Sequence, residues 1–327
     1  MKTVLVTGAS GFVGGHVVEA LARNGIRPRC LVRRMSRLAC IKAWSPELVL
    51  GDVTLPASLE TAVEGVDGIV HVAGLTRASS MSDYLRVNAD GCSNLYRACL
   101  AKNPAVQRIV HISSLAAWGA SVPGRPVQEG QEQCPVSNYG SSKLAGQRIA
   151  AAHMDRLPIT ILAPAAVYGP FDRAFLRLFA CAKRGIAPAI GRDERRVSLI
   201  YAKDLARAVL ACLESEKAAG NEYLLEDGHS HTWREVTAAI GQSMHTSPVR
   251  VRIPLWVARA AGAVIGCAAR CTGKQAFFDG DRLKDFLQPS WTCSSAKISA
   301  ELGFAPQYTL EQGIAETCRW YKEHNWL

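Results

Sequence analysis

The chain has 327 residues, a length that favours one large or two modest folded units. Hydrophobic residues make up 48 % and charged residues 20 %, which excludes a disordered or fibrous protein. The net charge of +10 suits an anionic partner, but the Lys and Arg residues form no basic block. A phosphorylated cofactor, an acidic carrier of the substrate or an anionic lipid surface is therefore favoured, and we expect no nucleic-acid partner.

The first residues lead directly into an apolar, strand-like stretch, so we expect no secretion signal and a cytoplasmic location. The apolar stretch at 260–269 falls well short of the roughly 20 residues that a spanning helix needs, so we expect no transmembrane segment. The eleven cysteines are scattered along the chain, which indicates free thiols and no metal site.

The first half of the chain alternates short β-branched runs with amphipathic stretches, as a parallel sheet with crossover helices requires. The predicted strands are residues 3–7, 29–33, 48–51, 68–72, 108–113 and 159–163. The predicted helices between them are residues 11–24, 56–63, 87–102 and 139–154. Because the strands are apolar almost throughout, helices should cover both faces of the sheet. The expected class is therefore α/β, with a doubly wound parallel sheet.

After Pro170 the pattern changes to longer helical stretches separated by short turns with Pro and Gly. This predicts a smaller, mostly helical C-terminal domain for the substrate. Two later stretches, 198–215 and 222–225, resemble the first half again, so the chain should cross between the domains more than once. We expect the first domain to comprise residues 1–168 plus about 198–226. The substrate domain should comprise about 169–197 and 227–327.

The strand at 3–7 leads into a turn with glycines at its first, fourth and seventh positions. Glycine permits a tight turn and lets the backbone approach a pyrophosphate, and the following helix offers its N-terminal N–H groups to the phosphates. An ordinary strand-to-helix turn is the alternative. The position at the first strand favours dinucleotide binding, which we assign to Gly8, Gly11, Phe12, Val13 and Gly14.

About twenty residues further on, Arg33 and Arg34 stand where an NAD-binding protein would have an acidic residue for the ribose hydroxyls. A guanidinium can bind a 2′-phosphate through two hydrogen bonds, whereas an acid would repel it. The sequence therefore predicts NADP(H) as cofactor. The alternative is that both arginines are solvated residues at the end of a strand.

The segment from Tyr139 to Lys143 places a phenol and an ammonium four residues apart, on one face of a predicted helix. A nearby ammonium lowers the pKa of a phenol, so the tyrosine can exchange a hydroxyl proton with a substrate while hydride moves to or from nicotinamide. Upstream, a strand ends in Ser113 and Ser114 at the sheet edge where ligands bind. A serine there can hydrogen-bond the substrate oxygen, or it can simply cap the next turn.

Together these residues resemble the extended short-chain dehydrogenases, the NAD(P)-dependent epimerase/dehydratase family. This superfamily includes nucleotide-sugar epimerases, dihydroflavonol reductases and 3β-hydroxysteroid dehydrogenases. The matching motifs are the glycine turn at 7–14, Gly51-Asp52-Val53, His71-Val72-Ala73-Gly74, Val87-Asn88, Ser113-Ser114, Tyr139 with Lys143, and residues 164–169. They cover the chain from residue 3 to about residue 170 in the order found in the family.

The resemblance implies roles for several residues around a bound cofactor. Asp52 and Val53 would meet the adenine, and Ala73 and Gly74 would lie along the phosphates and ribose. The nicotinamide would be bordered by Pro164 and Val167.

The resemblance also implies a catalytic group of Ser114, Tyr139 and Lys143, with Ser114 favoured over Ser113. Lys143 would hydrogen-bond the nicotinamide ribose, and Asn88 would support the site from a helix. His16, His71 and His111 are interpreted as residues of the fold. The helices at 87–102 and 139–154 would form a homodimer contact.

Two departures from the sugar-nucleotide enzymes bear on the substrate. The arginine that those enzymes carry seven residues before an aspartate, here Asp204, is replaced by Val197, and Arg196 is out of phase. The apolar run that begins at Ile253 resembles a pocket-lining segment of steroid- and flavonoid-type reductases, although such a run is also typical of plain core. We favour an oxidoreductase acting on an apolar alcohol or ketone, with a nucleotide-sugar epimerase or dehydratase as the alternative. A non-catalytic NADP-binding module is a third reading.

Overall fold

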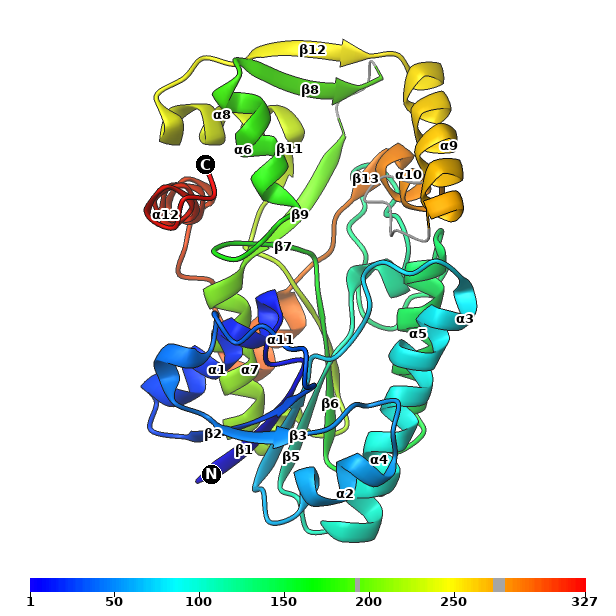
Figure 1. The fold of residues 1–327 in the computed structure, drawn as a ribbon, viewed down its shortest axis with the longest axis vertical. Helices are drawn as coiled ribbons and strands as arrows, with labels where there is room; N and C mark the ends of the chain where they lie inside the picture. Colours follow the sequence, from blue (N-terminus) through cyan, green and yellow to red (C-terminus); the bar gives the residue numbers. More distant parts are fainter. Residues whose placement is uncertain (192–194, 273–279) are drawn as a thin grey trace.

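The computed structural model describes residues 1–191, 195–272 and 280–327. Its centre is a seven-stranded parallel sheet in the order β10-β6-β5-β4-β1-β2-β3 (Figure 1). The strands are β1 (Thr3–Thr7), β2 (Arg27–Val32), β3 (Glu47–Leu50), β4 (Gly68–His71), β5 (Arg108–Ile112), β6 (Ile159–Pro164) and β10 (Glu222–Leu225). This is the doubly wound order of a Rossmann fold with one added strand.

Helices cover both faces of the sheet and bury its inner strands on both sides, whereas the edge strand β3 is partly exposed. On one face, α1 (Phe12–Arg23) packs beside α7 (Ala202–Glu214), and α11 (Ala296–Leu302) joins them over β10. The other face carries α2 (Ala57–Val63), α4 (Gly91–Lys102) and α5 (Asn138–Ala151). Two short segments precede α4, namely α3 (Met81–Leu85) and a π-helical turn at Arg86–Asp90. Short 3-10 turns lie at Lys42–Trp44, Leu115–Ala117 and Glu216–Ala218.

The remaining elements form a smaller part around a second apolar core. In a small sheet, β9 (Arg196–Tyr201) pairs with β7 (Ala166–Tyr168), β11 (Ser230–Thr232) and β13 (Ser290–Trp291). A separate pair joins β8 (Ile186–Ile190) to β12 (Val249–Ile253). The helices of this part are α6 (Phe175–Lys183), α8 (Trp233–Met244), α9 (Leu255–Thr272), α10 (Gly280–Leu287) and α12 (Leu310–Glu323).

The predicted fold class is confirmed: every strand and helix predicted before residue 164 has a counterpart within a few residues. The prediction for 87–102 was too simple, because the first turn of that stretch is π-helical and only the rest is α-helix. The chain returns to the large sheet through β10, although β9 belongs to the small sheet. In the described ranges, no helix is long and apolar enough to cross a membrane.

Candidate active site

The strand order reverses between β1 and β4, and ligands of doubly wound sheets bind at the carboxyl edge beside such a reversal. The glycine turn lies at this point. Gly8 has a φ of +70°, and a Cβ on it would lie 2.7 Å from the backbone nitrogen of Ala73, on the neighbouring strand end. A Cβ on Gly14 would lie 2.2 Å from the carbonyl oxygen of Gly8. Neither position accepts a side chain, so the backbone alone forms this surface.

Helix α1 starts directly after this turn and directs its N-terminus to the same edge. Gly11 is its N-cap and carries no side-chain cap, and Phe12 and Val13 form the first turn, both half-buried. An uncapped helix N-terminus offers N–H groups and a positive dipole end to an anion. The backbone shape and this helix end together fit the pyrophosphate of a dinucleotide.

The end of β2 carries Arg33 and Arg34, and both side chains are exposed. Arg33 approaches the carboxylate of Asp52, with 3.9 Å between Nη1 and Oδ2. The Asp52 carboxylate accepts hydrogen bonds from the backbone and the hydroxyl of Thr54, at 2.9 and 2.8 Å. Val53 is buried against α4. The arginines and the pair of residues at 52 and 53 therefore lie at the same end of the site.

The two adjacent serines after β5 point in different directions. Ser113 is buried, and its hydroxyl donates a 2.6 Å hydrogen bond to the amide oxygen of Gln147. Ser114 is only half-buried, and its Oγ accepts a 3.2 Å hydrogen bond from the backbone of Ala116. A half-buried hydroxyl that keeps its own proton can still donate to a substrate oxygen, whereas the Ser113 hydroxyl already donates within the core.

Tyr139 and Lys143 lie on the first turns of α5, which Ser137 caps by accepting from the backbone of Gly140 at 3.2 Å. The Tyr139 ring is half-buried, 6.3 Å from the ring of Tyr84. Lys143 is buried, and its Nζ donates a 2.7 Å hydrogen bond to the carbonyl oxygen of Ile112. Burial lowers the pKa of the Lys143 ammonium below its ordinary value.

Asn88 connects three segments of the site from the π-helical turn before α4. Its amide oxygen accepts from the backbone nitrogen of Leu75 at 2.7 Å, and its amide nitrogen donates to Leu75 and to Ser142, at 3.0 and 2.8 Å. The Cβ of a residue at Gly74 would lie 3.8 Å from the Lys143 Nζ. Gly74 therefore lies close to the buried ammonium, and Asn88 holds the loop after β4 against α5.

The remaining predicted cofactor residues lie on β6 and β7. Pro164 ends β6 and is buried, and Val167 lies in β7 and is half-buried. The structure thus brings the predicted residues to one edge of the sheet. Cys267 and Cys271, which stand four residues apart without a second ligand pair nearby in the sequence, have side chains outside the described residues.

Three buried residues behind the site were not recognised as a group from the sequence. The ligand atoms of His71, Cys92 and His111 lie within 4.8 Å of one another, close enough to share a metal ion. Existing hydrogen bonds, however, join Nδ1 of His71 to Thr7 and Nδ1 of His111 to Tyr96, each at 2.7 Å. Burial lowers the pKa of His71 to about 3 and lowers that of His111 as well. A lowered pKa makes an imidazole a poor proton acceptor, which agrees with the interpretation of both histidines as residues of the fold.

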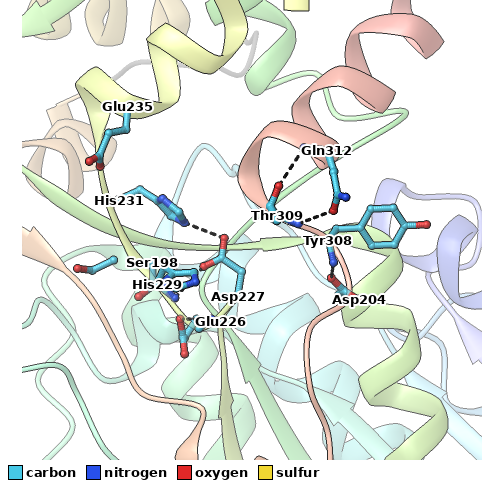
Figure 2. A network of polar contacts seen from close by, with 12 residues as sticks. Ser198, Asp204, Glu226, Asp227, His229, His231, Glu235, Tyr308, Thr309 and Gln312 are labelled. Atoms are coloured by element: carbon cyan, nitrogen blue, oxygen red, sulfur yellow. Dashed lines mark hydrogen bonds and ion pairs between the residues drawn. The ribbon is translucent and has the colours of Figure 1, made fainter.

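A polar network joins the end of β10 to the smaller part (Figure 2). Asp227 accepts a 2.8 Å hydrogen bond from Nε2 of His231. Burial lowers the pKa of His231, but the hydrogen bond and charge of Asp227 raise it above its ordinary value. Asp204 accepts two backbone hydrogen bonds at 3.0 Å, from Gln307 and Tyr308. The network attaches the loop before α12 to α7.

The structure also locates the two sequence features that bear on the substrate. Val197 is buried in β9, and the adjacent Arg196 faces away from the core and donates to Ser230 at 2.9 and 3.1 Å. The Arg196 guanidinium is therefore already hydrogen-bonded to Ser230. The apolar run after Ile253 begins α9, and Trp256 in its first turn is 73 % exposed.

Comparison with known proteins agrees with this geometry. The model of the NAD dependent epimerase/dehydratase family matches residues 4–225. The chain is 32 % identical over 325 residues to the ceramide reductase of Caulobacter vibrioides, covering 99 % of this chain and 96 % of that protein. It is 26 % identical over 337 residues to the UDP-glucose 4-epimerase of Vibrio cholerae, covering 99 % and 97 %. The fold matches the dTDP-glucose 4,6-dehydratase of Streptomyces venezuelae with a TM-score of 0.81 at 23 % identity, covering 99 % of this chain and 98 % of that chain.

The chain belongs to the NAD dependent epimerase/dehydratase family. It is an NAD(P)-dependent enzyme of the extended short-chain dehydrogenase/reductase type, with the oxidoreductase or epimerase chemistry of that family.

Proposed function

We propose that the protein is an NADP(H)-dependent oxidoreductase that moves hydride to or from a hydroxyl or keto carbon of an apolar substrate. The observation that carries the proposal is the convergence of Ser114, Tyr139 and Lys143 beside the glycine turn at one edge of the sheet. A bound nicotinamide supplies or accepts the hydride. The residues of this chain bind the reactants and handle the proton.

The proposal assigns the cofactor site to residues that share the carboxyl edge of the sheet. These are Gly8, Gly11, Phe12, Val13, Gly14, Arg33, Arg34, Asp52, Val53, Ala73, Gly74, Asn88, Tyr139, Lys143, Pro164 and Val167. The preference for NADP(H) rests on the exposed arginines after β2, where an NAD enzyme has an acid. Two guanidiniums with solvent-facing ends can approach a 2′-phosphate with little rearrangement.

Tyr139 is the proposed general acid and base. An ammonium close to a phenol favours the phenolate, and Lys143 is buried on the same face of α5, one turn further. In the reducing direction, the phenol gives its proton to the carbonyl oxygen as that carbon becomes an alcohol. Ser114 hydrogen-bonds the same oxygen and positions it.

The substrate part of the proposal rests on two observations. Val197 is buried where sugar-nucleotide enzymes present an arginine, and Arg196 is held by Ser230. The relative with 32 % identity is named a ceramide reductase, and a ceramide is an apolar lipid. The epimerase relative is 26 % identical, so a nucleotide sugar is the competing substrate.

The decisive assay gives the purified enzyme NADPH and two panels of compounds in parallel. The apolar panel contains keto lipids, aryl ketones and alicyclic ketones, and the other panel contains UDP-, GDP- and dTDP-sugars. Reduced nicotinamide absorbance and product identity are followed together. We expect stoichiometric loss of NADPH with an alcohol product from the apolar panel. The outcome against the proposal is conversion of a nucleotide sugar without net change in absorbance, together with no reaction of the apolar panel. It would favour a nucleotide-sugar epimerase instead.

The proposal includes a homodimer formed through α4 and α5, as is common in the superfamily that the sequence resembles. Exposed Arg97 on α4 and Arg148 on α5 are available for charge reversal on these helices. Light scattering on the wild type and on Arg97→Glu/Arg148→Glu tests this contact. A wild-type mass of one chain would contradict it.

A further inference from the structure

The outer side of α9 is apolar. Trp256 and Val264 are 73 % and 69 % exposed, and Ala260, exposed between them, lies on the same face because the three are spaced by four residues. The opposite side of the helix is the packed one, since Ala258 and Gly262 are buried. Figure 1 shows α9 at the outer margin of the smaller part, far from β3. An exposed tryptophan and an exposed valine two turns apart on one helix face indicate a contact surface.

Positive charge accompanies this apolar face along the chain. Residues 236–272 contain four arginines and no aspartate or glutamate. Arg250 and Arg252 are exposed on β12, directly before α9, and Arg259 is exposed on α9 itself. Val249 and Val251 of β12 are also exposed. We call β12 together with the exposed side of α9 the distal face.

Such a combination of tryptophan, aliphatic residues and arginines is typical of helices that lie in the interface of a bilayer. The tryptophan suits the headgroup region, and the arginines attract anionic lipids at about a fivefold gain in affinity for each residue. An acidic protein partner would need the same charge, but not a row of apolar side chains along a helix. The distal face therefore fits an anionic lipid surface best.

The distal face is connected to the candidate active site. Helix α10 packs on α9, and its Asp281 accepts a 2.9 Å hydrogen bond from the backbone nitrogen of Asn138. Asn138 directly precedes Tyr139 and begins α5. The surface that would meet lipid is thus one helix away from the proposed general acid and base.

We propose that the distal face docks the enzyme on an anionic bilayer, from which its apolar substrate enters the site beside α10. This inference rests on the proposed function, because it makes a membrane lipid the substrate class. Docking is peripheral: the apolar side of one helix and the arginines of one strand meet the headgroups.

The test measures binding of the full-length enzyme to sedimented vesicles. One set contains phosphatidylcholine alone, and the other contains equal amounts of phosphatidylcholine and phosphatidylglycerol. We expect binding to the second set only, and weaker binding at high salt. Arg250→Glu/Arg252→Glu should weaken it at least about thirtyfold, and Trp256→Gln/Val264→Gln at least about tenfold. The matched controls, Arg27→Glu/Arg156→Glu and Leu48→Gln, change exposed residues of the large domain and should bind as wild type.

Activity separates the two proposals. With a short-chain, water-soluble ketone, the distal-face variants should keep the wild-type rate; with a long-chain ketone embedded in the anionic vesicles, they should lose about tenfold or more. If the wild-type enzyme reduces the soluble ketone but does not bind the vesicles, the docking proposal is overturned and the proposed function stands. A wild type that reduces no apolar ketone would overturn the proposed function, whatever its vesicle binding. Equal loss of binding in the controls, or a distal-face variant that binds as wild type, would also overturn docking.

Discussion

The Nζ of Lys143 donates a 2.7 Å hydrogen bond to the carbonyl oxygen of Ile112, the last residue of β5. Because Ser114 follows Ile112 by two residues, this bond ties the helix that carries Tyr139 to the strand end that carries the proposed substrate hydroxyl. Within the described part of the chain, no carboxylate forms an ion pair with this ammonium. The site therefore holds a buried positive charge, an arrangement that costs stability.

That cost can be measured by Lys143→Met, which keeps the length of the side chain and removes its charge. We expect the free energy of unfolding to rise by about 1 kcal/mol or more, because losing the desolvated charge outweighs losing one hydrogen bond. Turnover should be lost at the same time. Urea unfolding at neutral pH provides the measurement, and Lys102→Met, at an exposed ion pair with Glu60, should change stability by less than about 1 kcal/mol. If Lys143→Met lowered the free energy of unfolding, the buried ammonium would not carry a net cost in stability.

Tyr139→Phe should lower kcat by about a hundredfold or more, since the ring remains but the proton carrier is lost. The dissociation constant of NADPH should stay close to the wild-type value. The control is Tyr84→Phe, because the Tyr84 ring lies 6.3 Å from that of Tyr139 and its hydroxyl donates to the backbone of Thr76. If Tyr139→Phe retained most of the rate, another group would have to carry the proton.

NADPH should bind more tightly than NADH. Each charge-assisted contact between an arginine and a phosphate contributes about 1.5–3 kcal/mol, so Arg33→Asp/Arg34→Asp should lower NADPH affinity by about a hundredfold or more and leave NADH affinity much less changed. Fluorescence titration of both cofactors gives the ratio. Arg27→Asp, at the opposite end of β2, should preserve it. Equal dissociation constants for the two cofactors in the wild type would refute the NADP(H) assignment.

Asp172 should make stability depend on pH. Its carboxylate accepts hydrogen bonds from the backbone of Ala174 and Phe175, at 2.8 and 3.0 Å, but burial raises its pKa to about 6. The folded state therefore holds the proton more tightly than the unfolded chain, whose pKa is near 4. The contribution to stability is present below about pH 4 and is lost as pH rises through about 6, with a loss of about 3 kcal/mol.

Asp172→Asn keeps a side-chain oxygen that can accept from the backbone of Ala174 or Phe175 and removes the titration, so its unfolding free energy should fall less than that of the wild type between about pH 4 and about pH 7. Asp155→Asn, at an exposed position, should follow the wild-type curve. Parallel curves for the wild type and Asp172→Asn would show that this carboxyl does not titrate in the stated range.

The sequence alone located the large sheet, the helices of its two faces and the glycine turn. These features depend on local properties: the period of apolar residues determines helix or strand, and only glycine fits the backbone at Gly8 and Gly14. The spacing of Tyr139 and Lys143 likewise places them on one helix face wherever that helix packs.

Other features were decided by the tertiary structure. Sequence spacing shows that a side chain lies on a given face of an element, but the packing of distant elements determines what covers that face. Gln147 draws the hydroxyl of Ser113 into the core and leaves Ser114 at the edge. The apolar run after Ile253 left pocket wall and plain core open, yet the helix packs by its opposite side and exposes the Trp256 indole. The contact of Asn138 with Asp281 joins residues 143 positions apart, a distance over which local pattern carries no information because only the folded chain brings them together.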